Sequence, residues 1–283
     1  MKKRIAYLVL FFAIMLLFFV LQKPCFMLYN DAPGRAVPFV GYLQVMLHGI
    51  SLDAATTGYL TALPWLTILI SIWFKKFPLR SILTGYYAII CLLVSLIFVG
   101  DMCLYPFWNF KLDASIFLYL DSPKNAMASV SIGFILLRVL IIILLSGFLT
   151  WILYKVTPRH LPPAQWRIAG SIATLLLGGV LFIIIRGGVS ESTSNIGQVY
   201  FCNDEFLNHS AVNPAFSLIA STGKTKNYAD QFNFFDEMHR KELFDNLYPT
   251  GGKNTIELLN TKRPNILIIL MEGFGATMVE SLG

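Results

Sequence analysis

Five long apolar segments constrain this chain more than any other feature of its sequence. They cover residues 5–21, 57–74, 82–100, 130–154 and 168–185. Each is about long enough to cross roughly 30 Å of hydrocarbon as a helix that rises about 1.5 Å per residue. The chain is 56% hydrophobic and only 13% charged over 283 residues, which is too apolar for a soluble domain of that size. We therefore predict an all-α polytopic membrane domain of five transmembrane helices over residues 1–186.

The first segment follows a basic start, which is also typical of a cleaved signal peptide. Residues 22–26, however, lack the small side chains of a cleavage site, and four further apolar segments follow. We predict that the first segment is an uncleaved span.

Basic residues collect in the loops on one side of the predicted membrane domain. That side carries Lys2, Lys3, Arg4, Lys75, Lys76, Arg80, Lys155, Arg159 and Arg167. The loops on the other side carry only Lys23, Arg35, Lys111 and Lys124. The positive-inside rule then places the amino terminus in the cytoplasm, and five spans place everything after Arg186 outside. These loops explain the net charge of +6, and no basic and aromatic groove indicates a nucleic-acid partner.

The two outward loops hold polar and aromatic residues. Residues 101–110 and 117–120 are rich in aromatic side chains, which suits the headgroup level of a membrane, and we expect them to cap the span bundle. We interpret Asp53 as a helix cap at the start of the second span. His48 is interpreted as an interfacial side chain, because no partner stands at metal-ligand spacing.

The cysteines indicate little about a site. Cys91 lies in a span, whereas Cys25, Cys103 and Cys202 fall on the predicted outer side. This odd number allows at most one disulfide, and the sequence does not choose the pair.

Two arginines lie toward the predicted outer leaflet. Arg138 is about two turns inside the fourth span, and Arg186 ends the fifth within Arg186-Gly187-Gly188. A charge at this depth is costly unless it reaches the interface or an anionic partner. One interpretation is that both side chains extend to any lipid phosphate at the interface. The other is that one or both hold the phosphate of a lipid substrate, since a guanidinium fork matches phosphate oxygens.

Residues 187–262 are more polar than the spans and contain several helix breakers. Two stretches, 204–220 interrupted at Pro214 and 230–247, are predicted as short amphipathic helices. We interpret the whole region as an extracytoplasmic juxtamembrane linker that lays a following domain against the membrane surface. A connector without that role is an equal alternative.

A different kind of segment begins at residue 263. Residues 265–271 form an apolar run of strand length that ends at Glu272, followed by Gly273, Phe274 and Gly275. Such a run is typical of a buried strand in a parallel sheet. Ligands bind at the carboxyl ends of the strands in open α/β sheets, and Glu272 is at such an end. Residues 263–283 therefore predict the truncated first strand of an α/β domain, and a lone strand lacks the partners it needs to form a sheet.

The same residues resemble a known family. Pro264-Asn265, the apolar run and Met271-Glu272-Gly273-Phe274 look like the opening of the catalytic domain of the sulfatase and alkaline phosphatase superfamily. More narrowly, they resemble its membrane-anchored phosphoglycerol transferases of the lipoteichoic acid synthase type, in which an Arg-Gly-Gly after the last span is also familiar. The resemblance implies that Glu272 is a ligand of a catalytic Mg²⁺ or Mn²⁺, a role suited to a hard carboxylate. It also implies that a Thr nucleophile lies downstream of Gly283, so we expect this chain alone to be inactive and to hold no metal.

The function that the resemblance implies is transfer of a phosphoglycerol group. The donor would be an anionic phospholipid of a bacterial plasma membrane, and the acceptor a hydroxyl of a glycan or polymer. One alternative is a phosphoethanolamine transferase or membrane-bound sulfatase of the same superfamily, which the downstream nucleophile would distinguish. The other is a non-enzymatic multi-pass protein, such as a transporter or scaffold. Against a transporter, the predicted spans are nearly free of interior charge except for Arg138.

Overall fold

The computed structural model describes residues 1–31, 37–74, 77–120, 130–159, 161, 164–223, 234–247 and 267. The chain divides into two compact units, Met1–Lys226 and Asn227–Gly283. Within the described residues, all regular structure is helical. The predicted strand over 265–271 lies outside the described residues, apart from Leu267, which belongs to neither a helix nor a strand. The α/β domain therefore stays a prediction.

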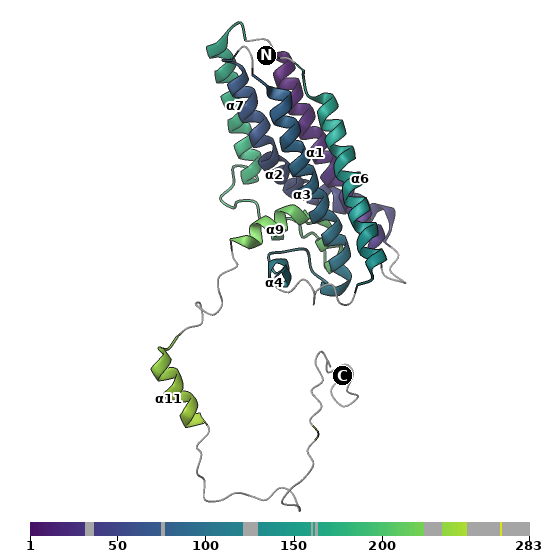
Figure 1. Ribbon diagram of the computed structural model, residues 1–283, viewed down its shortest axis with the longest axis vertical. Helices are drawn as coiled ribbons and strands as arrows, with labels where there is room; N and C mark the ends of the chain where they lie inside the picture. The colour runs from purple at the N-terminus through teal and green to yellow at the C-terminus, as the bar shows by residue number, and fades with distance from the viewer. Residues whose placement is uncertain are drawn as a thin grey trace, which may run out of the picture. The chain divides into compact units, whose positions relative to one another are not determined.

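Among the described residues of the first unit, five helices are long and apolar enough to cross a membrane, as the sequence predicts. They are α1 (Lys2–Tyr29), α2 (Phe39–Ser71), α3 (Leu79–Trp108), α6 (Ile132–Val156) and α7 (Arg167–Arg186). Figure 1 shows them side by side in one bundle. The coarse architecture, a multi-pass helical membrane protein, is thus the one expected from apolar length alone.

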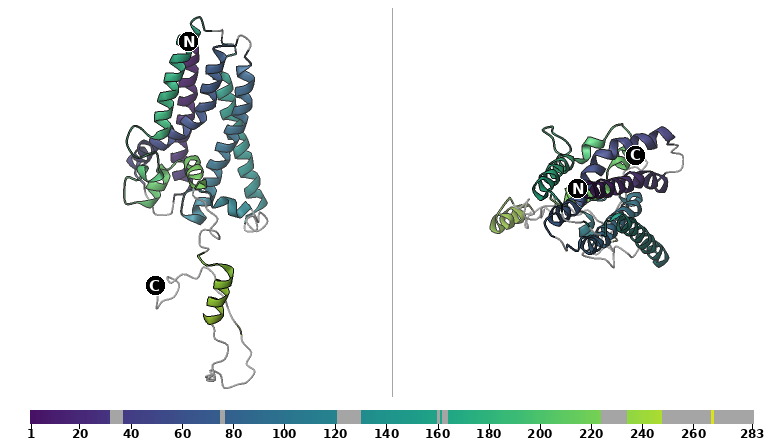
Figure 2. Two further views of the ribbon diagram at one scale, coloured as in Figure 1. Left: turned by 90° about the vertical axis from the view of Figure 1, so that its left-hand side faces the viewer. Right: turned by 90° about the horizontal axis from the view of Figure 1, so that it is seen from above.

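The helices pack in a defined order around an apolar core. Contacts join α3 with α6, α1 with α2, and α2 with α7, and the view from above shows the bundle in cross-section (Figure 2). Phe11, Met15, Phe19, Leu83 and Tyr87 are almost fully buried in this core. In α6 and α7 few residues are instead buried, namely Leu149, Leu153, Gly170, Thr174 and Leu181, and many of the others are exposed and apolar, so these two helices offer a large surface to lipid.

Three helix boundaries differ from the predictions. α1 and α3 each run about two turns past the predicted apolar segment, and α2 begins at Phe39 rather than at residue 57. The interpretation of Asp53 as a helix cap is wrong, because the residue before α2 is Pro38 and Asp53 is fully buried inside the helix. The residues of α3 after Gly100 are likewise helical and not a loop.

Short helices cover one end of the bundle, opposite to the amino terminus of α1 (Figure 1). They are α4 (Ile116–Leu120), the 3₁₀ helix η1 (Ile196–Val199), α8 (Glu205–Ala211) and α9 (Pro214–Thr222). The break predicted at Pro214 is confirmed, because Asn213 caps α9 by accepting from two backbone N–H groups and Pro214 occupies its first turn. We call this end of the molecule the α8–α9 end.

The segment between α3 and α6 lies against these short helices. The Ala114 backbone N–H donates to the Ser221 hydroxyl of α9 at 2.9 Å. The Trp108 ring stacks on Phe110 and also contacts Tyr119. These aromatic rings therefore cluster at the α8–α9 end, and a cap on the outer face of the bundle stays a prediction. In the second unit, the described helix is α11 (Glu237–Leu247), within the predicted range 230–247.

The orientation in the membrane stays a prediction, and cysteine labelling tests it. In a variant with the native cysteines replaced, Pro78→Cys is expected to be protected and Ser192→Cys to react with a membrane-impermeant thiol reagent in intact cells. The physical reason is that the basic loops, including the one before α3, are retained on the cytoplasmic side. Labelling of Pro78→Cys together with protection of Ser192→Cys would show that the orientation is opposite to the predicted one.

Candidate functional site at the α8–α9 end

A buried ion pair joins the first two long helices at the α8–α9 end. The Lys23 ammonium of α1 donates to Asp53 Oδ2 of α2, and the two side chains are 3% and 0% exposed. Asn213 Nδ2, at the start of α9, donates to Asp53 Oδ1 at 2.9 Å. One carboxylate therefore connects two spans and the segment that follows the membrane domain.

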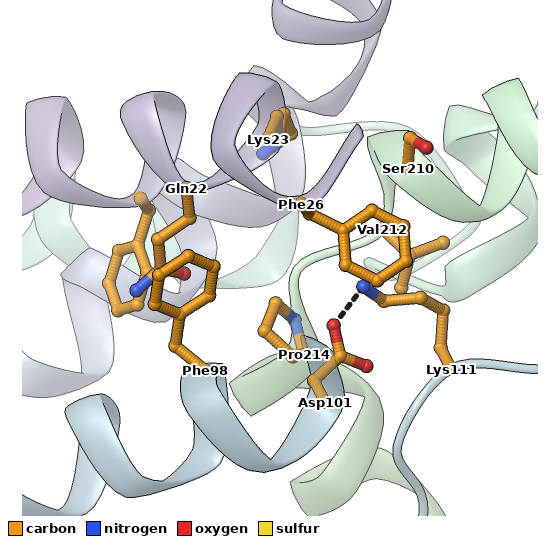
Figure 3. A pocket seen from close by; sticks show the side chains of 10 residues that line it. Gln22, Lys23, Phe26, Phe98, Asp101, Lys111, Ser210, Val212 and Pro214 are labelled. Carbon is orange, nitrogen blue, oxygen red and sulfur yellow. Dashed lines mark hydrogen bonds and ion pairs between the residues drawn. The ribbon is translucent and has the colours of Figure 1, made fainter. Parts of the chain in front are cut away.

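A second buried pair lies close by, at the end of α3. The Lys111 ammonium donates to Asp101 Oδ2 (Figure 3). The Leu112 backbone N–H donates to Asp101 Oδ1 at 2.9 Å, and the Lys111 ammonium lies 3.7 Å from the centre of the Phe26 ring. Burial lowers the pKa of the Lys111 ammonium, and the Asp101 carboxylate opposes that shift. The Lys111 ammonium is thus stabilised by the Asp101 carboxylate and by the face of the Phe26 ring.

These four charges have a structural explanation. An unpaired ion costs several kcal/mol to bury, so each cation needs a carboxylate and each carboxylate needs further donors. Both conditions are met, because each lysine has a carboxylate and each carboxylate has a second donor. Asn213 donates to Asp53 Oδ1, and the Leu112 N–H donates to Asp101 Oδ1. We interpret the first pair, through Asn213, as the attachment of α9 to α1 and α2, and the second pair as the attachment of the residues after α3 to the end of that helix.

Close packing supports the same attachment. A Cβ atom added at Gly49 of α2 would lie 2.1 Å from Lys23 Cε and 2.3 Å from the backbone oxygen of Ala211. Because the second atom belongs to the backbone, no side-chain rotation could relieve that clash. Glycine at this position lets α1, α2 and the end of α8 meet.

A small cavity of about 10 Å³ lies beside the second pair, with Gln22, Phe98 and Pro214 in its lining (Figure 3). Gln22 is only 4% exposed, and neither its Oε1 nor its Nε2 has a hydrogen-bond partner among the described residues. A space of this size is about that of one water molecule, which could satisfy the amide. The cavity is too small for a substrate.

The two predicted lipid-binding arginines have different surroundings. Arg138 Nη2 donates to the Tyr29 hydroxyl at 2.7 Å, and its guanidinium lies 4.4 Å from the centre of the Phe134 ring. Its Nε has no partner among the described residues. Arg186 Nη1 instead donates to the carbonyl oxygens of Gly188 at 3.0 Å and Ser190 at 2.5 Å.

These contacts give the two side chains different capacities. Arg186 closes the turn after α7, where Gly187 and Gly188 have positive φ angles of 89° and 117°. The Arg138 side chain contacts Tyr29 and Cys103, its Nε is a buried atom, and no carboxylate among the described residues lies within ion-pair distance of it. Lipid-phosphate binding stays a prediction for both residues, and the geometry favours Arg138.

The metal prediction is not tested by this geometry. Glu272 lies outside the described residues, and the described part of the chain contains no group of three or more metal-ligating side chains. His48 stacks on Phe201 with ring centres 4.4 Å apart, which fits its interpretation as an interfacial residue. The four cysteines, all within the described residues, are free thiols.

The paired lysines are the site residues that sequence reasoning misses. The loop-charge pattern counts Lys23 and Lys111 as loop residues, whereas both are buried and paired. The available signal is that each outward loop also carries an acid next to an apolar segment, Asp53 and Asp101.

Comparison with known proteins adds no further constraint. No protein-family model matches the chain, and no solved structure matches it.

Proposed function

We propose that this chain is the membrane anchor and the beginning of an extracytoplasmic, metal-dependent transferase. The group transferred is phosphoglycerol, taken from an anionic phospholipid and passed to a hydroxyl of a glycan or polymer. One observation carries the proposal. The described part of the chain has five helices long and apolar enough to cross a membrane, and the sequence after them contains an apolar run that ends in Glu272. The order of these parts is the one that the resemblance to lipoteichoic acid synthase-type enzymes implies.

The chemistry of the proposed reaction depends on residues beyond this sequence. Glu272 would hold a Mg²⁺ or Mn²⁺ ion together with ligands downstream of Gly283. Such an ion supplies charge that lowers the pKa of the nucleophilic Thr and neutralises the phosphoryl oxygens. Residues 1–283 supply the membrane domain and one ligand, and they are proposed to be inactive alone.

The bundle has a physical role in this proposal. A phospholipid donor stays in the leaflet, so the catalytic domain must be held at the membrane surface. The Lys23–Asp53 pair and Asn213 attach the start of α9, which leads toward residue 263, to α1 and α2. Arg138 is the cation proposed to contact the donor phosphate, because it lies on α6, which has few buried side chains, and its own side chain is only partly buried.

The alternatives from the sequence stay open. A phosphoethanolamine transferase or a membrane-bound sulfatase would use the same kind of anchor. The sequence argues against a transporter because the predicted spans carry almost no charge. That argument is weaker in the structure, because Lys23 and Asp53 lie inside α1 and α2. Both are neutralised at one end of the bundle, however, and not at its middle, where transporters usually bind their substrates.

Arg138→Gln is expected to lower the amount of phospholipid that co-purifies with the chain, whereas Arg186→Gln is expected to lower it much less. The reason is that Arg138 is partly exposed on α6, whereas the Arg186 guanidinium is committed to backbone carbonyls. Quantitative mass spectrometry of bound lipid, with thermal unfolding as a check on folding, measures both effects. Equal lipid retention by the parent and Arg138→Gln would remove Arg138 from the proposed site.

A further inference from the structure

The first three turns of α2 carry an exposed apolar surface. Its side chains are between 42% and 75% exposed, and they are Phe39, Val40, Leu43, Leu47 and Ile50. Successive residues of a helix are about 100° apart around its axis, so these five fall on one side, within an arc of about 100°. The opposite side, with Val45 and Leu52, is buried against α1 and α8. We call the exposed surface the α2 stripe.

The length of α2 places this stripe at the edge of the hydrocarbon. The 33 residues of the helix rise about 50 Å at about 1.5 Å per residue, against roughly 30 Å of hydrocarbon. A tilt of about 40°, the upper end of the usual range, still leaves roughly 38 Å along the membrane normal. Counted from Ser71 at the other end of the helix, about 20 residues fill the hydrocarbon and reach only residue 52.

Contacts with the chain after α7 indicate the same level. Gln198 Nε2 of η1 donates to Ser51 Oγ at 3.1 Å, and the Phe201 ring stacks on His48 with ring centres 4.4 Å apart. Gln198 and Phe201 both follow Arg186, where the last long helix ends. His48 and Ser51 therefore form a polar edge beside the stripe, which this part of the chain covers while the stripe itself stays exposed.

The direction and composition of the segment both suit a membrane surface. Seen from above, the end of α1 and the start of α2 extend to one side of the bundle (Figure 2). Residues 37–51 contain no Asp, Glu, Lys or Arg. A helix with an apolar side and a polar edge at this level lies along the interface, with its apolar side about 5–10 Å below the headgroups. The lipid that surrounds the bundle reaches this level, so it can cover the stripe without any further partner.

We infer that the start of α2 is an interfacial anchor, with the α2 stripe on the acyl chains of the leaflet at the α8–α9 end and its polar edge among the headgroups. The partner is the bilayer itself and not one kind of lipid, because the segment has no charge with which to select a headgroup. The inference holds for either orientation of the chain and is independent of the proposed transfer reaction.

The test measures the depth of single side chains in choline phospholipid nanodiscs. In the chain with its native cysteines replaced, an environment-sensitive fluorophore is attached to a cysteine at Leu43, Leu47, Leu63 or Ser192. Its quenching is measured with aqueous iodide and with lipids that carry a nitroxide near the headgroup or deep in the acyl chain. Leu63 is a control inside the span, and Ser192 is an exposed control in the turn after α7.

Labels on the stripe should be shallow but shielded from water. At Leu43 and Leu47, most of the iodide quenching seen at Ser192 should be lost, and the shallow nitroxide should quench more strongly than the deep one. The order of the two nitroxides should be reversed at Leu63, about 12 Å along the helix from Ser71. Iodide quenching equal to that at Ser192 would overturn the inference, and so would stronger deep than shallow quenching. Shielding from iodide and from both nitroxides would also overturn it, because protein and not lipid would then cover the stripe.

A charge variant tests the apolar contact itself. Leu43→Glu combined with Leu47→Glu places two carboxylates on the stripe, where acyl chains cannot solvate them. A label at Ile50 should then gain iodide quenching and lose quenching by the shallow nitroxide. Gln44→Glu, which adds a carboxylate to an exposed position next to the stripe, should leave the label at Ile50 shielded. Unchanged quenching at Ile50 in a double variant that keeps its helical circular dichroism would contradict the inference.

Discussion

Asp53→Asn is expected to lower the free energy of unfolding of the membrane domain by about 3–5 kcal/mol, the usual cost of removing one partner from a buried ion pair. The variant leaves the Lys23 ammonium buried without its counter-ion, in a position that is only 3% exposed. The asparagine has nearly the same shape as the aspartate, so the change in charge dominates the effect. Thermal or denaturant unfolding in detergent, followed by loss of the monodisperse species, measures it.

A double variant distinguishes lost pairing from general damage. Lys23→Met combined with Asp53→Asn removes both charges, and it should recover most of the stability that Asp53→Asn alone loses. Glu191→Gln, which neutralises an exposed acid, should unfold like the parent. A double variant no more stable than Asp53→Asn, or a single variant as stable as the parent, would show that the pair does not hold α1, α2 and the α8–α9 segment together.

The second large effect concerns the catalytic reaction. In a form of the protein that continues past Gly283, Glu272→Ala is expected to lower headgroup transfer by more than about a hundredfold, beyond the effect typical of an outer-shell partner. The bound divalent metal should be lost together with activity, because the carboxylate is proposed to hold the ion directly. Metal content by elemental analysis and transfer activity are measured on the same preparation.

The control for this variant is another acid of the same region. Glu257→Ala removes a carboxylate that does not end the apolar run, and it should keep both metal and activity. Expression and membrane insertion of Glu272→Ala should equal those of the parent, since the five long helices precede residue 272. A Glu272→Ala variant that retains its metal and its activity would end the assignment of this residue as a ligand.

The sequence predicts the long helices because their signal is local. Each is marked by a continuous apolar segment, and the part of the chain that the structure describes contains five such helices. Their ends are harder to predict, because polar residues there have partners from other elements. α1 continues past Lys23 and α3 past Asp101, since each charge is neutralised within the fold. A pattern in the local sequence cannot show that a charged residue is paired with an opposite charge in the folded protein.

The candidate site illustrates the same limit more strongly. Asp53 binds Lys23 at a separation of 30 residues and Asn213 at a separation of 160. From sequence alone, the helix-cap interpretation of Asp53 is reasonable, because aspartate is a common cap and no partner stands nearby in the chain. A cavity of about 490 Å³ at the same end is lined by three segments, 29–31, 105–109 and 205–206, that lie far apart in the sequence. Such arrangements follow from how the helices pack, which periodicity does not specify.

The most direct test of the proposed transfer reaction is an assay of the longer protein with defined donors. Vesicles carry a phospholipid with an isotope in its headgroup, either glycerol or ethanolamine, and the assay measures release of diacylglycerol and passage of the label to a hydroxyl acceptor. The proposal predicts release and transfer that require Mg²⁺ or Mn²⁺, stop on chelation and fail in Glu272→Ala, with the glycerol lipid as donor. A folded, metal-loaded protein that releases no diacylglycerol from either lipid would contradict the proposal.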